Sequence, residues 1–323
     1  MVPFISVVIT TYNYGNFLRR CLSSVLNQNF PQEHREILIV DDGSTDDTPE
    51  ILAGYGDAIR CIRQENSGQA VAINRAMESA KGELVSFLDA DDEWYPHKLE
   101  RIASEFRDPE VGMVQHGLDV KTSVANSSFR LHERLSSGRI GEQILTPDFK
   151  CNPTSALSFR TEILKQVLPL PFELRTGADW YLCVITGLLT KISAIQEPLG
   201  VYWVHGENHF TNNRTAESLK QQLVTINLVR ELSKKVAISN GLKIPERFEA
   251  NHHSEYPVFC RINLAWQERE FHAIPGYFLN YVRKYAIPEY GWSLRLLRRS
   301  FRMAACALLP PPLYRKLGFY SHG

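Results

Sequence analysis

The chain has 323 residues, and its 36 Lys and Arg are balanced by 36 Asp and Glu, so the formal net charge is zero. This length suits one large domain with an appendage, and the balanced charge gives no bulk attraction to nucleic acid. The longest apolar candidate, residues 303–309, stops at three prolines and is too short to cross a bilayer.

The first hundred residues alternate between strand-like and helix-like segments. Strands are predicted over 4–9, 36–40, 59–63 and 84–89. Helices are predicted over 17–26 with Asn16 as the N-cap, from Thr48-Pro49 onward, and over 70–80. This alternation favours a mostly parallel sheet with helices on both faces.

Polar side chains follow three of these strands at the point where each strand ends. They are Thr10, Tyr12, Asp41, Asp42, Asp89 and Asp91. Because the carboxyl ends of parallel strands share one edge, where open α/β sheets bind ligands, these residues are expected to form one site.

The acidic run 89–92 carries the strongest chemical signal. Carboxylates with one residue between them can hold a hard divalent cation, and that cation can neutralise a diphosphate. The alternative is an acidic turn that caps the next helix. Neither a dinucleotide-binding glycine pattern nor a phosphate loop occurs, so a metal would have to supply the neutralisation.

These segments resemble glycosyltransferase family 2, whose members are inverting enzymes with the GT-A fold. The resemblance rests on residues 6–13, 40–46, 66–74 and 88–92 and covers roughly the first 210 residues. One departure is Thr10, where many members have proline. The resemblance implies an α/β fold with a Rossmann-like, mostly parallel sheet, followed by a mainly helical C-terminal extension.

The resemblance also implies roles for single residues at the donor site. Thr10 and Tyr12 would line the nucleobase pocket, and Asp42 would accept a hydrogen bond from the base. Asp89 would reach the ribose or the water shell of the metal, and Asp91 would coordinate magnesium or manganese as the last carboxylate of the DXD motif. The residues implied to bind the nucleotide sugar are Thr10, Tyr12, Asp41, Asp42, Asn66, Gly68, Asn74, Asp89 and Ala90.

Structural alternatives remain open for several of these residues. Asp42 and Ser44 could form a turn followed by a helix cap, and Tyr12 could pack against a loop.

The middle of the chain resembles the acceptor half of the family. Residues 151–156 resemble the segment that enters this half, and 177–182 resemble the family's acidic-Asp-aromatic element, with Ala178 in place of the usual first acid. The resemblance makes Asp179 the general base, which would take the proton of an acceptor hydroxyl. Asp179 could instead be an ordinary N-cap. Trp180 could stack on an acceptor sugar or lie in the core.

Residues 200–208 resemble the family's Tyr-x-x-His-x-x-Asn segment. His205 is therefore a candidate to contact the metal or the diphosphate, together with Asp89 and Asp91. The alternative is a structural histidine that is hydrogen-bonded to a loop carbonyl.

The organisation of the chain changes near residue 215. Leu219, Leu223, Ile226, Val229 and Leu232 recur at helical spacing. From residue 280 onward there are eight Lys or Arg against one acid, and 293–309 interleaves basic with apolar residues. This pattern predicts contact with an anionic membrane; the alternative is a solvated helix packed on the catalytic domain.

These observations predict a glycosyltransferase domain over 1–214, with a donor-nucleotide half (1–115) and an acceptor half (116–214), followed by a helical, basic region over 215–323. Six scattered cysteines and an N-terminus that leads directly into a strand predict reduced thiols in the cytoplasm. A peripheral position on the inner face of the cytoplasmic membrane is compatible with the basic region.

The predicted function is inverting transfer of a sugar from a nucleotide-diphospho-sugar to a hydroxyl of a glycan or lipid-linked glycan, in polysaccharide biosynthesis. A UDP-sugar donor with Mn²⁺ or Mg²⁺ is expected, and GDP and dTDP donors remain open. One alternative is a catalytically silent module that binds sugar nucleotides or glycans. The other is a sugar nucleotidyltransferase, whose glycine-rich, Arg- and Lys-bearing loop is absent from residues 10–16.

Overall fold

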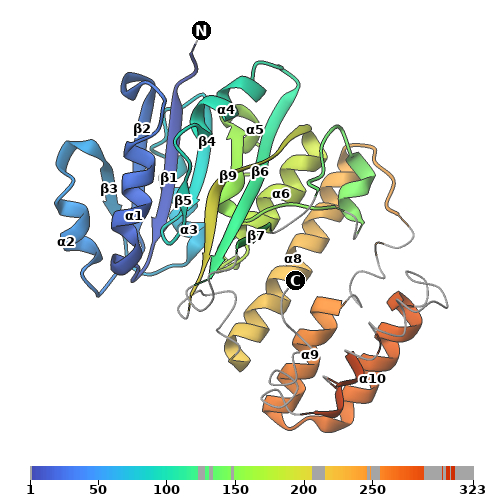
Figure 1. Ribbon diagram of the computed structural model, residues 1–323. Coiled ribbons are helices and arrows are strands. Elements are labelled where there is room, and N and C mark those ends of the chain that lie inside the picture. The colour runs from blue at the N-terminus through green and yellow to red at the C-terminus, as the bar shows by residue number, and fades with distance from the viewer. Residues whose placement is uncertain are drawn as a thin grey trace.

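The computed structural model describes residues 2–122, 128–130, 134–146, 149–205, 215–245, 248, 255–286, 300, 303–305 and 307–309. Most of the predicted basic amphipathic segment 293–309, and residues 206–208 of the predicted Tyr-x-x-His-x-x-Asn segment, lie outside these ranges. Figure 1 shows a sheet-based α/β body, with the helices of the C-terminal region beside it.

One sheet organises the described part of the chain. Its strands are β1 (Ile5–Thr11), β2 (Arg35–Asp41), β3 (Arg60–Arg63), β4 (Leu84–Asp89), β5 (Glu93–Trp94), β6 (Val111–Thr122), β7 (Ser128–Arg130), β8 (Leu157–Arg160) and β9 (Lys191–Val204). The strand order is β3-β2-β1-β4-β8-β6-β9-β5, and β7 pairs with β6. The four predicted strands are confirmed within one or two residues.

The sheet is parallel in its first half and mixed in its second. Strands β3, β2, β1 and β4 are parallel, β8 is antiparallel to both β4 and β6, and β9 is parallel to β6. Because β8 is antiparallel to both of its neighbours, β4 and β6 run in the same direction. Strand β9, which is parallel to β6, also runs in that direction. The carboxyl ends of all these strands except β8 therefore share one edge.

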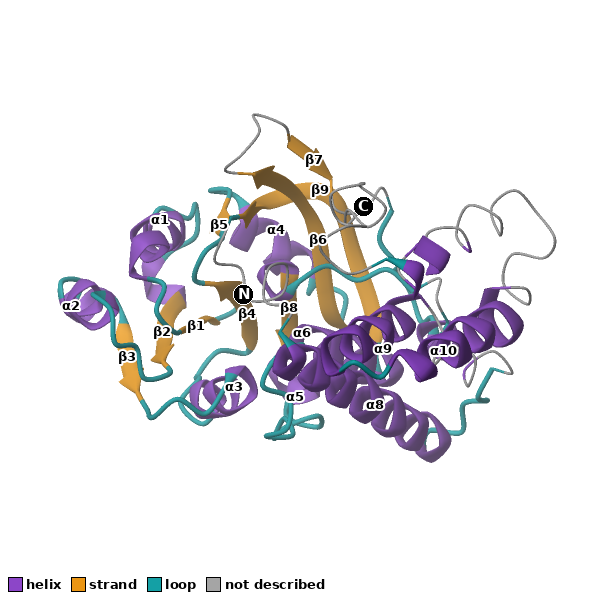
Figure 2. Ribbon diagram, turned by 90° about the horizontal axis from the view of Figure 1, so that it is seen from below, coloured by secondary structure: helices purple, strands orange, loops and turns teal. Residues whose placement is uncertain are grey.

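Helices cover both faces of the sheet. The α-helices are α1 (Gly15–Leu26), α2 (Thr48–Ala53), α3 (Gln69–Met77), α4 (Lys98–Glu105), α5 (Thr161–Leu164), α6 (Ala178–Leu189), α8 (Ala216–Ser239), α9 (Glu255–Glu268) and α10 (Ile274–Asn280). The other helical segments are the 3₁₀ turns η1 (Gln32–His34), η2 (Gly56–Ala58), η3 (Gly141–Leu145), η4 (Thr154–Ala156) and η6 (Phe271–Ala273) and the π-helix η7 (Tyr281–Ala286). Figure 2 shows α1 and α4 on one side of the sheet and α3, α6 and α8 on the other.

Alternating strand residues supply a separate core to each face. Val7 and Ile9 of β1 pack with α1, α2 and α4, whereas Val8 packs with α3 and α6. This follows from the two-residue period of a strand that is buried on both faces. Val229 and Ala237 of α8 belong to the same core as α6, while Leu219 at the start of α8 joins a third core with α9.

Helix α1 begins one residue before the predicted N-cap. Asn16 lies inside the helix and Tyr14 is the N-cap residue, which corrects the sequence prediction. The carboxylate of Asp46, on the loop after β2, accepts a hydrogen bond from the Gly15 amide at 3.0 Å. The cap is therefore supplied by a distant loop, and a local capping pattern could not reveal it.

The cysteines differ in part from the predicted reduced thiols. Cys151 and Cys183 of α6 are joined as a disulfide, while Cys21, Cys61 and Cys260 are not disulfide-bonded. The two bonded cysteines are 32 residues apart, so only the packing of α6 brings them together. Every helix among the described residues is too short or too polar to span a membrane.

Candidate functional site

The carboxyl ends of β1, β2 and β4 bring the predicted polar residues to one edge of the sheet. In the strand register Thr10 lies opposite Asp89, and Thr11 lies opposite Asp41. Thr10 and Tyr12 are partly exposed at this edge. Polar residues from three separate strands therefore meet at one edge of the sheet, as the parallel arrangement requires.

The turns that follow β1 and β2 are tied together. Asn13 has a left-handed backbone (φ 56°), and its N–H donates to Ser44 Oγ at 2.9 Å, while its Oδ1 accepts from the Thr45 N–H at 2.7 Å. Asp41 is buried; its Oδ1 accepts from the Ser44 N–H at 2.8 Å, and its Oδ2 lies 3.5 Å from Arg63 Nε. These bonds fix the turns next to Thr10 and Tyr12, the residues predicted to line the nucleobase pocket.

Asp42 holds the loop that precedes α3. Its Oδ1 accepts from Gln64 Nε2 at 2.7 Å and from the Ser67 N–H at 2.8 Å, and its Oδ2 accepts from the Gly68 N–H at 2.8 Å. Gly68 has φ 93°, a conformation that favours glycine. Both oxygens of Asp42 therefore have protein partners, and a direct contact with a base stays a prediction.

The other predicted donor residues occupy different surroundings. Asn66 is exposed on the same loop, and Ala90 is buried in the acidic turn. Asn74 of α3 uses both ends of its amide on Leu170: Nδ2 donates to the Leu170 carbonyl at 2.9 Å, and Oδ1 accepts from the Leu170 N–H at 2.7 Å. The observed contacts of Asn74 therefore fix the segment before α6.

Asp91 and Asp92 of the acidic run have different partners. Asp92 is fully buried; its Oδ2 accepts from Ser155 Oγ at 2.5 Å, and its Oδ1 accepts from the Trp203 N–H at 2.9 Å. Asp91 Oδ2 lies 3.1 Å from His205 Nε2. The run leads into β5 and not into a helix, because α4 starts only at Lys98. The helix-capping alternative for this turn is therefore wrong.

Asp89 lies at the centre of the carboxylate group. Burial raises its pKa well above the usual range, Asp91 and then Asp179 raise that pKa further, and hydrogen bonds from Ser155 and Thr154 partly offset the effect. A carboxylate that resists ionisation next to other carboxylates is typical of a functional site. The structure thus brings Asp179 into electrostatic contact with the acidic turn.

Asp179 lies in the first turn of α6. Gly177, with φ 79°, is the N-cap residue, so the proposal that Asp179 itself caps the helix is wrong. Asp179 Oδ1 accepts from the Trp180 N–H at 2.8 Å, and desolvation raises the pKa of Asp179. The Trp180 side chain is 40% exposed, which excludes the core position considered for it.

His205 follows the last residue of β9 and is packed between two kinds of partner. Its ring stacks on Phe17 of α1, with centroids 4.0 Å apart, and its Nε2 faces Asp91. This partner differs from the loop carbonyl considered as the structural alternative. Because Phe17 fixes the ring plane, His205 presents a defined nitrogen to the acidic turn.

Sequence reasoning missed residues that support the acidic turn. Arg20 of α1 donates from Nη2 to the Asp91 carbonyl at 2.7 Å, and nothing in the local sequence marks it. Tyr202 of β9 lies among the carboxylates: burial raises its pKa, and Asp92, Asp89, Asp91 and Asp179 raise it further. Its place in the segment before His205 is the signal that could have found it.

The donor set suits a hard divalent cation only in part. Within the described ranges, no group of three or more His, Cys, Asp or Glu side chains is placed so that together they could hold a metal ion. Magnesium and manganese commonly keep water and phosphate oxygens and need only one or two carboxylates from the protein. Asp91 and His205, 3.1 Å apart, fit such an open site, and a cation there would relieve the crowded negative charge that raises the pKa of the neighbouring Asp89.

Comparisons with known proteins agree on one family. The model of the family described as "Glycosyl transferase family 2" matches residues 6–168, half of the chain. Asp179 and His205 lie beyond the matched range. The chain is also 38% identical, over 223 residues, to an uncharacterized glycosyltransferase from Nostoc sp., a match that spans 66% of this chain and 69% of that relative.

Two solved structures share the fold. S. aureus TarS 1-349 in complex with UDP aligns with a TM-score of 0.59 and 19% identity, covering 94% of this chain and 88% of TarS 1-349. The mannosyltransferase PcManGT from Pyrobaculum calidifontis in complex with GDP-Man and Mn²⁺ aligns with a TM-score of 0.52 and 22% identity, covering 98% of this chain and 83% of that one. The GT-A fold predicted from the sequence is therefore confirmed, including a helical C-terminal region.

Proposed function

This chain belongs to glycosyltransferase family 2, and on that premise we propose that it transfers a sugar from a nucleotide-diphospho-sugar to an acceptor hydroxyl by a metal-assisted single displacement. The donor we propose is a UDP-sugar, and the acceptor is a glycan or a lipid-linked glycan in polysaccharide biosynthesis. A single displacement inverts the anomeric centre and needs no covalent intermediate.

The observation that carries this proposal is the position of Asp179. It comes from α6, yet it acts on the pKa of Asp89 at the end of β4. A candidate base and candidate metal ligands are thus close enough to act on each other electrostatically. This juxtaposition is what an in-line displacement between two substrates requires.

Each carboxylate has a distinct task in this proposal. Asp179 accepts the proton of the acceptor hydroxyl as the new bond forms, and its raised pKa makes it a stronger base than a free aspartate. Asp91 and His205 would hold the divalent cation, and Asp89 would reach its water shell. When bound, the cation would stabilise the negative charge that develops on the nucleoside diphosphate.

The donor pocket uses the turns after β1 and β2. Thr10 and Tyr12 would line the base, next to the turn fixed by Asp41 and the loop that Asp42 holds. TarS was solved with UDP, and PcManGT with GDP-Man and Mn²⁺, so both nucleotides occur with this fold. A UDP-sugar is the first candidate, and GDP-mannose is the comparison donor.

We extend the proposal to the C-terminal region. The division at residue 215 would separate the catalytic domain from a region whose eight basic residues after 280 contact an anionic membrane that carries a lipid-linked acceptor, on the inner face of the cytoplasmic membrane. Cosedimentation with phosphatidylglycerol vesicles at low salt tests this extension. A protein that stays in the supernatant would overturn it.

Donor binding and turnover test the catalytic proposal. A thermal-shift series with MnCl₂ and either UDP-GlcNAc or GDP-mannose should raise the melting temperature most with the preferred donor. The same donor should release nucleoside diphosphate only when Mn²⁺ or Mg²⁺ is present. Absence of release with every donor, despite binding, would favour the silent-module alternative.

Asp179→Asn separates the base from donor binding. We expect kcat to fall by about 10²- to 10⁴-fold, the usual contribution of a general base, with an unchanged donor-induced shift in melting temperature. In the parent enzyme, kcat should fall as pH drops through the raised pKa of Asp179, at a higher pH than for a free aspartate. Near-normal turnover of Asp179→Asn would remove the assignment.

A further inference from the structure

Helix α8 contacts the segment that leads into Asp179. Gln221 Nε2 donates to the Glu173 carbonyl, and Thr225 Oγ1 donates to the Thr176 carbonyl at 3.1 Å. Gln221 and Thr225 are four residues apart and therefore lie on one face of α8. A helix from beyond residue 215 thus bonds to two carbonyls of segment 173–177, shortly before the proposed base.

The same face of α8 packs against the N-cap of α6. Gly177 has φ 79°, and a Cβ added there would lie 2.9 Å from Thr225 Cγ2. Both the left-handed conformation and the closeness of Thr225 require glycine at this position. Thr225 is 5% exposed, so its hydroxyl and methyl groups both act within a packed contact.

The end of the loop before α3, at Gly68, and the first residue of α3, Gln69, also contact segment 173–177. The Gln69 N–H donates to the Arg175 carbonyl at 3.4 Å, and a Cβ on Gly68 would lie 3.2 Å from Arg175 Cα. Gly68 is itself held by Asp42. Segment 173–177 is therefore bounded by α8 and by the loop that ends at Gly68, and one residue, Ala178, separates its end from Asp179.

We propose that α8 positions the Asp179 carboxylate for proton abstraction, with Thr225 and Gln221 as the positioning residues. This inference rests on the proposed role of Asp179 as the base. A backbone shift at Gly177 moves the first turn of α6 and with it the carboxylate, and a misplacement of about 1 Å can reduce turnover by about 10²-fold. The region after 215 would thereby act in catalysis as well as in any acceptor or membrane contact.

Amide hydrogen exchange tests the contact between α8 and segment 173–177 without any substrate. Thr225→Val keeps the side-chain volume and removes the hydroxyl, so amides over 175–181 should exchange about 5- to 10-fold faster, as expected for one lost hydrogen bond. Thr225→Ser keeps the hydroxyl and its bond to the Thr176 carbonyl, so amides over 175–181 should exchange more slowly than in Thr225→Val. The matched control is Val224→Thr, the reverse change at the neighbouring exposed position.

We expect the amide exchange rate to increase only over residues 175–181, and only in Thr225→Val. The exchange rates of the β1 amides should be unchanged in all variants. Unchanged exchange in Thr225→Val would overturn the inference. An equal increase in Val224→Thr would also overturn it, because the effect would then reflect general loosening of α8.

Kinetic measurements show whether the contact between α8 and segment 173–177 contributes to catalysis. With Mn²⁺ and the donor chosen by thermal shift, Thr225→Val should lower kcat for nucleoside diphosphate release by about 10-fold and leave the donor KM unchanged, and Thr225→Ser should restore most of kcat. A purely structural role would lower the melting temperature of Thr225→Val without this kcat effect, and that result would contradict the proposal.

The two proposals can fail separately. Normal turnover in Asp179→Asn would overturn the base assignment, whatever the exchange data show. An inactive Asp179→Asn variant, together with parental exchange and parental kcat in Thr225→Val, would overturn only the role of α8.

Discussion

At the scale of single residues, surroundings assign different tasks to neighbouring carboxylates. Asp92 is buried with two protein donors and ties β9 and Ser155 to the acidic turn, whereas Asp91 faces His205. Burial, followed by Asp91 and Asp89, raises the pKa of Asp92 well above its usual range. The sequence shows three equivalent acids, and only their partners distinguish a structural carboxylate from a candidate metal ligand.

Lys98 is a charged residue that the fold buries at a cost. Its side chain is fully buried, with Nζ 3.3 Å from the centroid of the Trp94 ring and 3.4 Å from Ser158 Oγ. Burial lowers its pKa well below the usual value. Since removing an ammonium group from water is costly, the aromatic and hydroxyl contacts offset only part of that cost.

Lys98→Met should therefore stabilise the protein at pH 7, by on the order of 1 kcal/mol in the free energy of unfolding. The lowered folded pKa means that the unfolded chain binds the proton more tightly. The loss of stability caused by burying Lys98 in the parent protein therefore decreases as pH rises toward about 10.4, the pKa of lysine in the unfolded chain.

Urea denaturation of both proteins at pH 7 and at pH 9.5 checks the sign of this effect. The stability gap between Lys98→Met and the parent should narrow at the higher pH. A Met variant that is less stable at pH 7, or a gap that is constant with pH, would contradict the account.

At the scale of elements, α1 and β9 brace the acidic turn from two sides. Arg20 of α1 bonds to the Asp91 carbonyl, and its guanidinium carbon lies 4.1 Å from the centroid of the Trp203 ring. Trp203 of β9 in turn donates its N–H to Asp92. The turn is thus fixed by contacts between elements that are far apart in the sequence.

Removing this brace should weaken metal binding more than chemistry. We expect Arg20→Ala to raise the Mn²⁺ concentration needed for half-maximal activity by about 10-fold, the equivalent of losing one hydrogen bond to a charged donor. At saturating Mn²⁺, kcat should change less. Arg20→Lys should be intermediate, because lysine keeps the charge but not the planar contact with Trp203.

The neighbouring exposed residue gives the control for this prediction. Arg19→Ala removes a similar charge from the same helix without a contact to Asp91 among those described. If Arg19→Ala and Arg20→Ala shifted the Mn²⁺ dependence equally, the effect would be bulk electrostatics and the brace would have no role.

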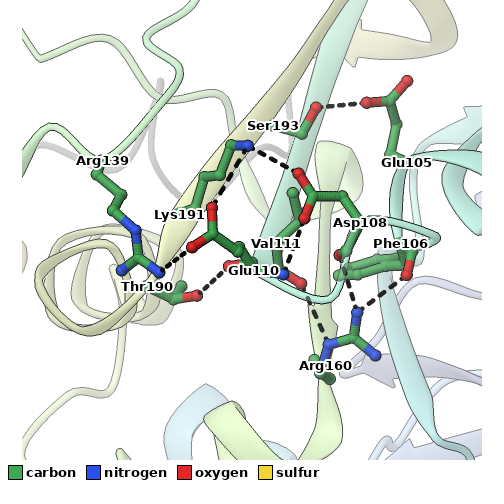
Figure 3. A network of polar contacts seen from close by, with 10 residues as sticks. All are labelled: Glu105, Phe106, Asp108, Glu110, Val111, Arg139, Arg160, Thr190, Lys191 and Ser193. Carbon is green, nitrogen blue, oxygen red and sulfur yellow. Dashed lines mark hydrogen bonds and ion pairs between the residues drawn. The ribbon is translucent and has the colours of Figure 1, made fainter.

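At the scale of the whole molecule, the candidate site and a network of stabilising polar contacts lie at opposite edges of the sheet. The site lies at the carboxyl edge, whereas a polar network lies at the opposite edge, where β6 and β9 begin (Figure 3). Lys191 contacts Asp108 at 2.7 Å, and Arg139 contacts Glu110 at 3.1 Å. The Lys191–Asp108 pair is about one third exposed and the Arg139–Glu110 pair more than half exposed, so solvent screening weakens both.

Arg160 is the stronger anchor in this network. It donates to the backbone carbonyls of Phe106, Asp108 and Val111, at 2.9 to 3.2 Å, and its side chain is only 22% exposed. Three backbone carbonyls lose a hydrogen-bond donor when Arg160 is replaced. The resulting decrease in the free energy of unfolding should therefore exceed the decrease caused by removing an exposed ion pair.

Arg160→Met should therefore lower the free energy of unfolding by about 2 kcal/mol, and Lys191→Met should lower it less. Because both residues lie at the opposite edge from the carboxylates, donor-induced thermal shifts and kcat should be unchanged in both variants. Thermal unfolding and diphosphate release measure the two effects. The reverse order of destabilisation, or a loss of turnover, would contradict this division.

Much of the N-terminal half could be predicted from the sequence for a local reason. The alternation of strand and helix patterns, and the position of Asp41, Asp42, Asp89 and Asp91 after strands, both follow from hydrophobic periodicity within short windows. The parallel register then brings the strand ends to one edge. The family resemblance and the GT-A fold rest on the same segments.

The tertiary structure decided what no short window contains. The cap of α1 by Asp46, the use of Asp42 to hold Gly68, the proximity of Asp179 to Asp89, and the contact of α8 with segment 173–177 all join residues distant in the chain. Local patterns encode which face a residue prefers and where an element ends. Which carboxylate meets which partner depends on packing between elements, because desolvation and hydrogen bonding are set by the neighbours that the fold supplies.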